Sequence, residues 1–217
     1  MKILALEFSS PRRSVAVVVD GQLRARVEEA DPRANRALSW IEAALRAAGL
    51  EREKVECLAI GIGPGSYTGI RSAIALAQGW QLARGTHILG ISSVECLAAQ
   101  AQAERIHGRI NIVIDAQRNE FYLARFEAGP SGARLLSPLH LAGRQTVLEL
   151  ISAGEIVLGP EAATWFPGAR AVFPDAAMLG QLAAQRDDFL PGEKLEPVYL
   201  REASFAKAKP PRVIPAV

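Results

Sequence analysis

The stretch GIGPGSYTGIR, Gly61–Arg71, decides the fold of this chain. It follows an apolar run at residues 55–62 that is suited to a buried strand, and it leads into residues 70–84, which have the apolar spacing of a helix. Glycines allow backbone N–H groups to approach a ligand closely, and the first turn of a helix favours anions. The stretch therefore predicts a strand, a turn and a helix, in which the turn either binds an anion or is a tight, well-capped connection.

This turn matches neither of two common phosphate-binding motifs. A P-loop ends in Gly-Lys followed by Ser or Thr, and the stretch contains no lysine. A dinucleotide-binding fingerprint needs a further glycine three positions after a Gly-x-Gly pair, and neither Gly61 nor Gly63 begins such a series. Ser66 and Thr68 can either cap the following helix or bind a phosphate oxygen. The pattern leaves the anion-binding turn and the structural turn as open alternatives.

The chain divides into two successive units with the same order of elements, and the stretch Gly61–Arg71 lies in the first of them. In the first unit we expect strands at residues 3–8, 14–19, 22–30, 55–62 and 88–91, and helices at residues 33–48, 70–84 and 93–104. The order then restarts, with strands at residues 109–115, 120–127, 133–141 and 155–158 and helices at residues 145–152 and 176–185. The sequence therefore predicts an α/β protein of two lobes. Residues 1–104 form a βββαβαβα lobe, and residues 105–217 form a second lobe that is truncated in its elements, more irregular, and poorly ordered from Lys207.

A second candidate site lies where the first strand of each lobe ends. Glu7 ends the first strand and is followed by the hydroxyls of Ser9 and Ser10 in a hairpin turn, and Asp115 occupies the equivalent position in the second lobe. In two-lobed folds, hairpins of this kind can bind phosphates while the carboxylate holds a hydrated metal ion. The alternative is that these are ordinary polar turn residues.

Two predicted helices carry more apolar surface than one sheet can cover. The helix at residues 70–84 has one face with Ile70, Ile74 and Ala77, and an opposite face with Ala75, Leu76, Gly79, Leu82 and Ala83. A helix that is apolar on both sides must be covered twice, once by its own sheet and once by another surface. On the helix at residues 33–48, Trp40 lies off the stripe of Ala34, Leu38, Ile41, Leu45 and Ala48. Trp40 is then either an interface anchor or part of a broad core-facing arc.

Composition excludes several classes of protein. The chain has 217 residues, 49% of them hydrophobic and 22% charged, which is typical of a globular protein and not of a disordered or fibrous one. A net charge of +2 is too small to indicate nucleic-acid binding. The two cysteines form no C-x-x-C pair and the three histidines no metal-ligand pair, so we expect buried thiols and no metal site. With no membrane-length apolar run and no signal peptide, we expect a cytoplasmic protein.

Five blocks in the same order resemble the TsaB (YeaZ) family, the partner subunit of the bacterial machinery that makes threonylcarbamoyladenosine (t6A) at position 37 of tRNA. These blocks are ILALEFSS at residues 3–10, Ile60–Arg71 followed by Ala77-Gln-Gly79, Ile91–Ala98, Ile114–Tyr122 and Glu196–Arg201. They span nearly the whole chain. The family usually has Asp where this chain has Glu7.

The resemblance implies an actin-like, sugar-kinase-like fold with a truncated second lobe and no catalysis by the chain alone. It implies pairing with the catalytic subunit TsaD through helices of the first lobe, with the ATPase TsaE bound at that junction and tRNA reached through the complex. It also implies a homodimer when the chain is alone and no cofactor of its own, with ATP or ADP and Mg at the junction of the complex. Carried over, the nucleotide or anion candidates are Glu7, Ser9, Ser10, Gly63, Gly65, Ser66, Thr68, Gly69 and Arg71. The candidates for the partner interface are Trp40, Ile70, Ala73, Ile74 and Ala77.

The competing interpretation is a small-molecule kinase or an ATP hydrolase that uses Glu7 and the turn at residues 63–69. Such an enzyme needs phosphate-binding groups from both lobes, and the second lobe has no comparable glycine-rich turn. A peptidase is not supported, because the sequence offers neither a metal site nor a nucleophile motif.

Overall fold

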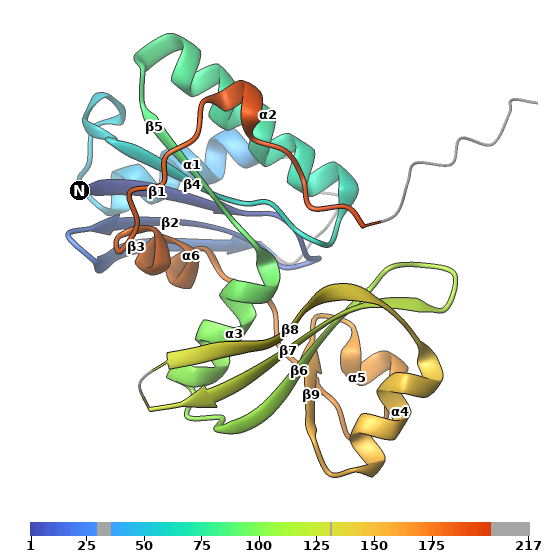
Figure 1. Cartoon of the computed structure of the whole chain (residues 1–217). Helices are drawn as coiled ribbons and strands as arrows, with labels where there is room; N and C mark the ends of the chain where they lie inside the picture. The colour runs from blue at the N-terminus through green and yellow to red at the C-terminus, as the bar shows by residue number, and fades with distance from the viewer. Residues whose placement is uncertain (30–35, 131, 201–217) are drawn as a thin grey trace, which may run out of the picture.

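The computed structural model describes residues 1–29, 36–130 and 132–200, which form two lobes stacked one above the other (Figure 1). The first lobe contains β1 (Lys2–Glu7), β2 (Arg13–Val19), β3 (Gln22–Glu29), α1 (Ala37–Ala47), β4 (Cys57–Gly61), α2 (Tyr67–Arg84) and β5 (His87–Ile91). The chain continues through α3 (Ser93–Ala103), β6 (Gly108–Asp115), β7 (Glu120–Gly129), β8 (Gly132–Gly143), α4 (Arg144–Ser152), β9 (Ile156–Gly159), α5 (Ala162–Trp165), β10 (Arg170–Ala171) and α6 (Ala176–Ala183). Short 3₁₀ turns lie at Arg52–Lys54 and Gly192–Lys194.

The two sheets follow the same path. The first has the strand order β3-β2-β1-β4-β5 and the second the order β8-β7-β6-β9-β10. In each sheet the first three strands of the lobe are antiparallel neighbours and the last two add in parallel. The predicted restart of the element order is therefore confirmed. The second lobe is the reduced copy, because its last strand, β10, has only two residues.

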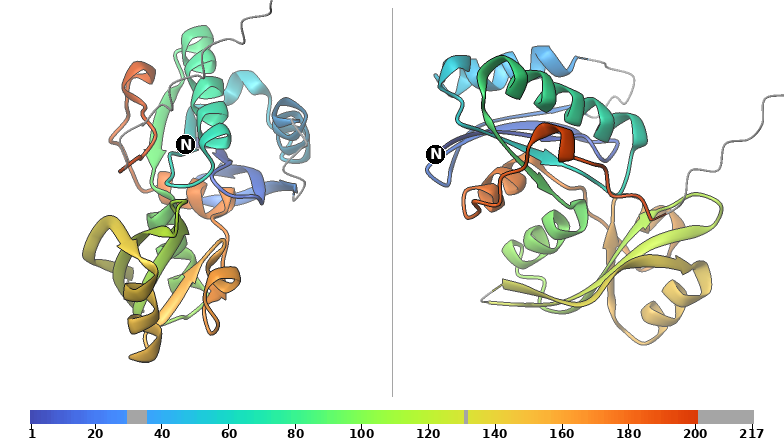
Figure 2. Two further views of the ribbon diagram at one scale, coloured as in Figure 1. Left: turned by 90° about the vertical axis from the view of Figure 1, so that its right-hand side faces the viewer. Right: turned by 45° about the horizontal axis from the view of Figure 1, so that its top comes forward.

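Both faces of the first sheet are covered by helices, as the alternation along β1 requires. Leu4 and Leu6 point into a core formed with α1 and α2, whereas Ile3 and Ala5 point into a core formed with α6. Figure 2 shows α1 and α2 together on one side of the sheet and α6 on the other. Helix α3 packs mainly on the second sheet.

The predicted division into residues 1–104 and 105–217 is wrong in two respects. Helix α3 lies before residue 104, yet most of its buried side chains belong to the core of the second lobe. Helix α6 lies after residue 105, yet Leu179 and Ala183 belong to the core of the first lobe. The predicted boundary missed this exchange, because it was drawn from the order of elements along the chain and not from which core each helix packs against. The prediction that residues 207–217 are poorly ordered lies outside the described residues, as does the predicted start of α1 at Arg33.

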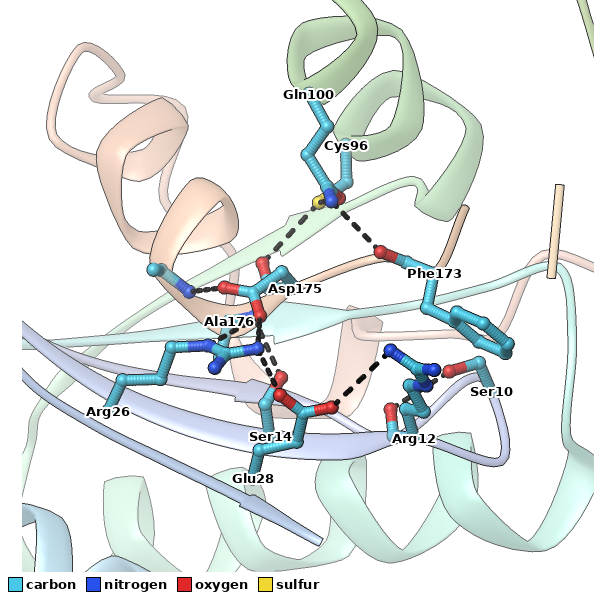
Figure 3. Close-up of polar contacts among 11 residues, drawn as sticks. Ser10, Arg12, Ser14, Arg26, Glu28, Cys96, Gln100, Phe173, Asp175 and Ala176 are labelled. Atoms are coloured by element: carbon cyan, nitrogen blue, oxygen red, sulfur yellow. Dashed lines mark hydrogen bonds and ion pairs between the residues drawn. The ribbon is translucent and has the colours of Figure 1, made fainter. Parts of the chain in front are cut away.

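The segment that leads into α6 joins the lobes through a polar network (Figure 3). Arg26 on β3 donates from Nε to Asp175 Oδ2 at 2.6 Å, and Asp175 Oδ1 accepts the N–H of Ala177 and caps α6. Ser14 Oγ on β2 accepts the N–H of Ala176 at 2.9 Å. The start of α6 is thereby attached directly to two strands of the first sheet.

The same segment is also attached to α3 and to the β1–β2 turn. Gln100 on α3 donates from Nε2 to the carbonyl oxygen of Phe173 at 2.9 Å. The Arg12 guanidinium lies over the Phe173 ring, 4.4 Å from its centroid, and 4.0 Å from a carboxylate oxygen of Glu28. These contacts hold the two lobes in one arrangement.

The segment after α6 runs back over the first lobe as a strap, residues 186–200. The N–H of Leu190 donates to the carbonyl oxygen of Ile88, and the N–H of Val198 donates to the carbonyl oxygen of Ile62. Leu195 is buried in the core beneath α2. The strap was not predicted, because it contains almost no regular secondary structure.

The five residues predicted to form the partner interface lie in the core and not on the surface. On α2 the buried face consists of Gly69, Ile70, Ala73, Ile74 and Ala77. On α1, Trp40 is buried and packs edge-on against Phe8, whereas Leu38, placed in the core stripe, is 68% exposed. Both errors arise because the apolar faces of each helix are alike in sequence, so composition cannot say which one meets the sheet.

Two alanines on α2 provide a matched test of this orientation. Ala77 is fully buried and Ala75 is exposed, although they are two residues apart. Ala77→Arg should lower the free energy of unfolding by about 3 kcal/mol or more, because it buries an unpaired charge. Ala75→Arg should change it by no more than about 0.5 kcal/mol. Urea denaturation of both variants measures this, and equal destabilisation would contradict the orientation of α2.

Candidate functional site

The glycine-rich turn lies directly against the turn between β1 and β2. A β-carbon at Gly65 would overlap the carbonyl oxygen of Ser9, and one at Gly69 would overlap the carbonyl oxygen of Phe8. Gly65 also has a φ of +150°, which side chains rarely allow. The N–H of Ser66 donates to the carbonyl oxygen of Ser9 at 2.7 Å. The glycines are therefore explained by the close approach of two backbone segments, without a ligand.

Three of the hydroxyl groups predicted to bind an anion, those of Ser9, Ser10 and Ser66, form hydrogen bonds within the protein. Ser93 donates to the Ser9 hydroxyl at 2.8 Å, and the Ser10 hydroxyl donates to the carbonyl oxygen of Arg12 at 2.9 Å. Ser66 Oγ accepts the N–H of Gly69 at 3.3 Å and caps α2, which begins at Tyr67 and not at residue 70. The structural alternative for the turn is the one that these contacts favour.

The structure brings most of the candidate residues together but leaves two of them outside. Glu7, Ser9 and Ser10 lie beside the turn formed by residues 63–69, which is the arrangement that the kinase interpretation expects. Thr68 and Arg71, however, are exposed on the outer side of α2. Arg71 lies over the ring of Tyr67, 4.7 Å from its centroid.

Glu7 is fully buried at the end of β1. Its Oε1 accepts the N–H of Ser9 at 2.7 Å, and its Oε2 has no hydrogen-bond partner in the described part of the chain. Burial raises the pKa of Glu7 to about 7, and the contacts with Ser9 oppose that rise. A β-carbon at Gly61 would overlap the carboxylate, so glycine at this position makes room for Glu7.

The second lobe repeats this arrangement at Asp115, as its position in the sequence predicts. Asp115 Oδ1 accepts the N–H of Gln117 at 2.7 Å, so in both lobes the carboxylate binds the N–H two residues later. Glu161 is an acidic residue that the sequence analysis missed. Burial raises its pKa, the nearby Asp115 adds to the rise, and its Oε2 has no hydrogen-bond partner among residues 1–29, 36–130 and 132–200. No motif marks Glu161, because only the fold places it near Asp115.

The described ranges offer neither a metal-binding cluster nor a membrane-spanning helix. They contain no group of three or more His, Cys, Asp or Glu side chains that could hold a metal ion. None of the helices described is long and apolar enough to cross a bilayer. Cys57 and Cys96 are free and buried, as expected, and burial raises the pKa of Cys57 to about 12.

The outer sides of α1 and α2 carry exposed apolar and small residues. Leu82 on α2 is 90% exposed and Leu38 on α1 is 68% exposed. Ala75, Gly79 and Ala83 on α2 are also exposed, and Ala75 lines a groove together with Leu38. We call these five residues the α1–α2 face. A groove of about 560 Å³ separates the two helices and is lined by Arg36, Ala37, Leu38, Ser39, Ser72, Ala75 and Leu76. A second groove of about 420 Å³ has an apolar floor that includes Ile41, Leu45, Leu50 and Trp80.

The repeated strand order and the paired acidic turns define an α/β protein with the two-lobed, actin-like and sugar-kinase-like fold. YeaZ from Pseudomonas aeruginosa superposes with a TM-score of 0.78 at 27% identity, over 92% of this chain and 99% of that one. The family profile of TsaD, tRNA N6-adenosine threonylcarbamoyltransferase, matches residues 29–135. The chain is 30% identical to tRNA threonylcarbamoyladenosine biosynthesis protein TsaB of Escherichia coli, over 93% of this chain and 95% of that protein. It is also 35% identical to the Haemophilus influenzae TsaB, over 58% of this chain and 53% of the relative.

The chain therefore belongs to the TsaB family of t6A biosynthesis.

The close approach at Gly65 can be tested against a glycine in open space. Gly65→Ala should lower the free energy of unfolding by about 3 kcal/mol or more, because the new methyl group overlaps the carbonyl oxygen of Ser9. Gly79→Ala should instead stabilise by about 0.5–1 kcal/mol, because a β-carbon there meets nothing within 4 Å and alanine favours the helix. Thermal and urea unfolding of the two variants provide the comparison. Equal effects would show that Gly65 is not packed against the β1–β2 turn.

Burial of Glu7 predicts a specific dependence of stability on pH. Its pKa is about 7 in the folded protein and 4.5 ordinarily, so folding is favoured by protonation and stability falls as pH rises from 4.5 through 7. The loss amounts to about 3 kcal/mol above pH 7. Glu7→Gln removes this contribution, and its stability advantage over the wild type should grow between pH 5 and pH 8. A difference in unfolding free energy that does not change with pH would contradict the buried, uncompensated carboxyl group.

Proposed function

We propose that this chain is a non-catalytic subunit that binds a TsaD-type threonylcarbamoyltransferase through the α1–α2 face and so supports t6A formation. The observation that carries the proposal is the α1–α2 face itself. Its five residues are exposed and are small or aliphatic, and two grooves between or beside the helices share Leu38 in their lining. Large exposed apolar surfaces of this kind are typical of protein interfaces.

The family match supports a partner of the TsaD type. The TsaD profile covers residues 29–135, a range that includes α1 and α2. A TsaD protein should then present a related pair of helices. Two related surfaces can pack against each other about an approximate two-fold axis, as identical subunits do in symmetric dimers. The same reasoning supports self-association of the chain when its partner is absent.

The remaining partners follow from this pairing. We place TsaE at the junction of the two subunits, with ATP or ADP and Mg bound there and not by this chain alone. The tRNA is then reached through the complex. The contacts of the glycine-rich turn support this assignment, because Ser9, Ser10 and Ser66 use their hydroxyl groups within the protein. The same contacts count against a kinase that would need these groups for phosphate.

Charged substitutions on the α1–α2 face test the proposal. Ala75→Arg and Leu82→Arg should each weaken binding to TsaD at least about tenfold, because they place a charge in an apolar contact. Leu135→Arg on β8 is the matched control, since it is an exposed apolar residue of the other lobe and should leave affinity unchanged. Calorimetric titration with TsaD measures the affinity, and t6A formation by the reconstituted system should fall in parallel. Unchanged affinity in both α2 variants would overturn the assignment.

A further inference from the structure

A small polar cavity lies at the junction of the two lobes, beside the network drawn in Figure 3. Its volume is about 250 Å³, below the range of about 300–1,000 Å³ that is usual for drug-sized ligands. Five charged side chains line it: Arg12, Arg26, Glu28, Glu104 and Asp175. We call it the interlobe cavity. Its size and its lining suit a small polar molecule.

Three of these five charges are already paired with one another. Arg26 donates from Nε to Asp175 Oδ2 and from Nη2 to Glu28 Oε2. The other oxygen of Asp175 caps α6. This wall of the cavity is therefore fixed by its own contacts, and it leaves Arg12 and Glu104 as the charged groups available to a ligand.

Arg12 is held in place while its hydrogen-bond donors remain free. Its guanidinium lies over the Phe173 ring, 4.4 Å from the centroid, and such stacking orients a guanidinium without using its N–H groups. A carboxylate oxygen of Glu28 lies 4.0 Å from Nη1, too far for a hydrogen bond. In the described part of the chain, no residue accepts a hydrogen bond from this guanidinium. A planar guanidinium with free donors can bind a carboxylate through two parallel hydrogen bonds.

Glu104 is the available charge of opposite sign, and it comes from a different wall of the cavity. It directly follows the last turn of α3, which packs on the second lobe. Among residues 1–29, 36–130 and 132–200, its exposed carboxylate has neither an ion pair nor a hydrogen bond. The C-terminal end of a helix also favours a cation. The carboxylate and the end of α3 therefore favour the same charge in a ligand.

A ligand with a single charge does not suit this pair of groups. An anion bound to Arg12 would share the cavity with the carboxylates of Glu28 and Glu104, and a cation bound to Glu104 would share it with Arg12. A small molecule that carries both charges satisfies both groups at once. A free α-amino acid carries such a pair, a carboxylate and an ammonium group on one carbon atom.

We propose that the interlobe cavity binds a small zwitterion of the α-amino-acid class. Arg12 binds the carboxylate, and Glu104 binds the ammonium group. Because these two residues belong to elements that pack in different lobes, the ligand bridges the lobes where the contacts of Asp175 already join them. The proposal uses no residue of the α1–α2 face, so it stands or fails independently of the pairing with TsaD.

The test is a titration of the full chain with L-alanine, followed by the amide signals in proton–nitrogen NMR correlation spectra. L-Alanine should shift the amides of Ser14, Gln100 and Glu104 in a saturable manner, with a dissociation constant on the order of 1 mM for so small a ligand. L-Alanine methyl ester lacks the carboxylate, and N-acetyl-L-alanine lacks the ammonium group. Each should bind at least about tenfold more weakly, because it leaves one charged group of the cavity without a partner.

Two substitutions assign the two charges of the ligand. Arg12→Gln should abolish the preference for L-alanine over its methyl ester, and Glu104→Gln should abolish the preference over N-acetyl-L-alanine. Arg24→Gln on β3 is the matched control, because Arg24 is exposed and does not line the cavity, and it should leave the affinity unchanged. Arg12 contacts Phe173, so thermal unfolding of Arg12→Gln shows whether that variant is folded. Glu104 is exposed at the end of a helix, so its variant tests the proposal without this concern.

Three results would overturn the proposal. The first is the absence of saturable shifts at about 20 mM L-alanine, well above the expected dissociation constant. The second is an equal response to ammonium acetate at the same concentrations, which would show that separate ions and not one zwitterion occupy the cavity. The third is binding by Glu104→Gln with the same charge preferences as the wild type.

Discussion

The close contact between the glycine-rich turn and the β1–β2 turn is the constraint on which the rest of the structure depends. Gly65 and Gly69 allow two backbone segments to meet where any side chain would separate them. This contact fixes the start of α2, and Ser66 then caps the helix. The direction of α2 in turn decides which of its two apolar faces is buried and which remains exposed. A turn that resembles a phosphate-binding loop in sequence is thus used to position a helix.

The groups around Glu7 and the glycine-rich turn stabilise the fold of this chain and are not free for a ligand. In an enzyme with such a fold, the groups around the first carboxylate would need to be free for a nucleotide. Here Glu7 is buried, its pKa is raised, and the neighbouring hydroxyls bind one another. The polar network around Asp175 holds the two lobes together, which suits a subunit that presents a fixed surface. The α1–α2 face remains exposed and is suited to contact another molecule.

Most of the fold could be predicted from the sequence, because alternation along the strands and spacing along the helices reflect burial directly. The restart of the element order and the equivalence of Glu7 and Asp115 were visible in this way. Contacts between segments far apart in the chain were not. The exchange of α3 and α6 between lobes, the strap and the position of Glu161 depend on tertiary packing alone. The buried face of α2 was assigned wrongly, because both of its faces are apolar in sequence. Ala75 and Ala77 are the same residue type, and only packing against the sheet shows that Ala77 is buried and Ala75 is exposed.

The most direct test of the central claim is a reconstituted t6A reaction with TsaC, TsaD, TsaE, tRNA, threonine, bicarbonate and ATP, with and without this chain. The chain alone is assayed for ATP hydrolysis in parallel. If the chain acts only by binding its partner, t6A formation should depend on the presence of the chain, and the chain alone should hydrolyse no ATP. Equal t6A formation without the chain, or ATP turnover by the chain alone, would contradict the account.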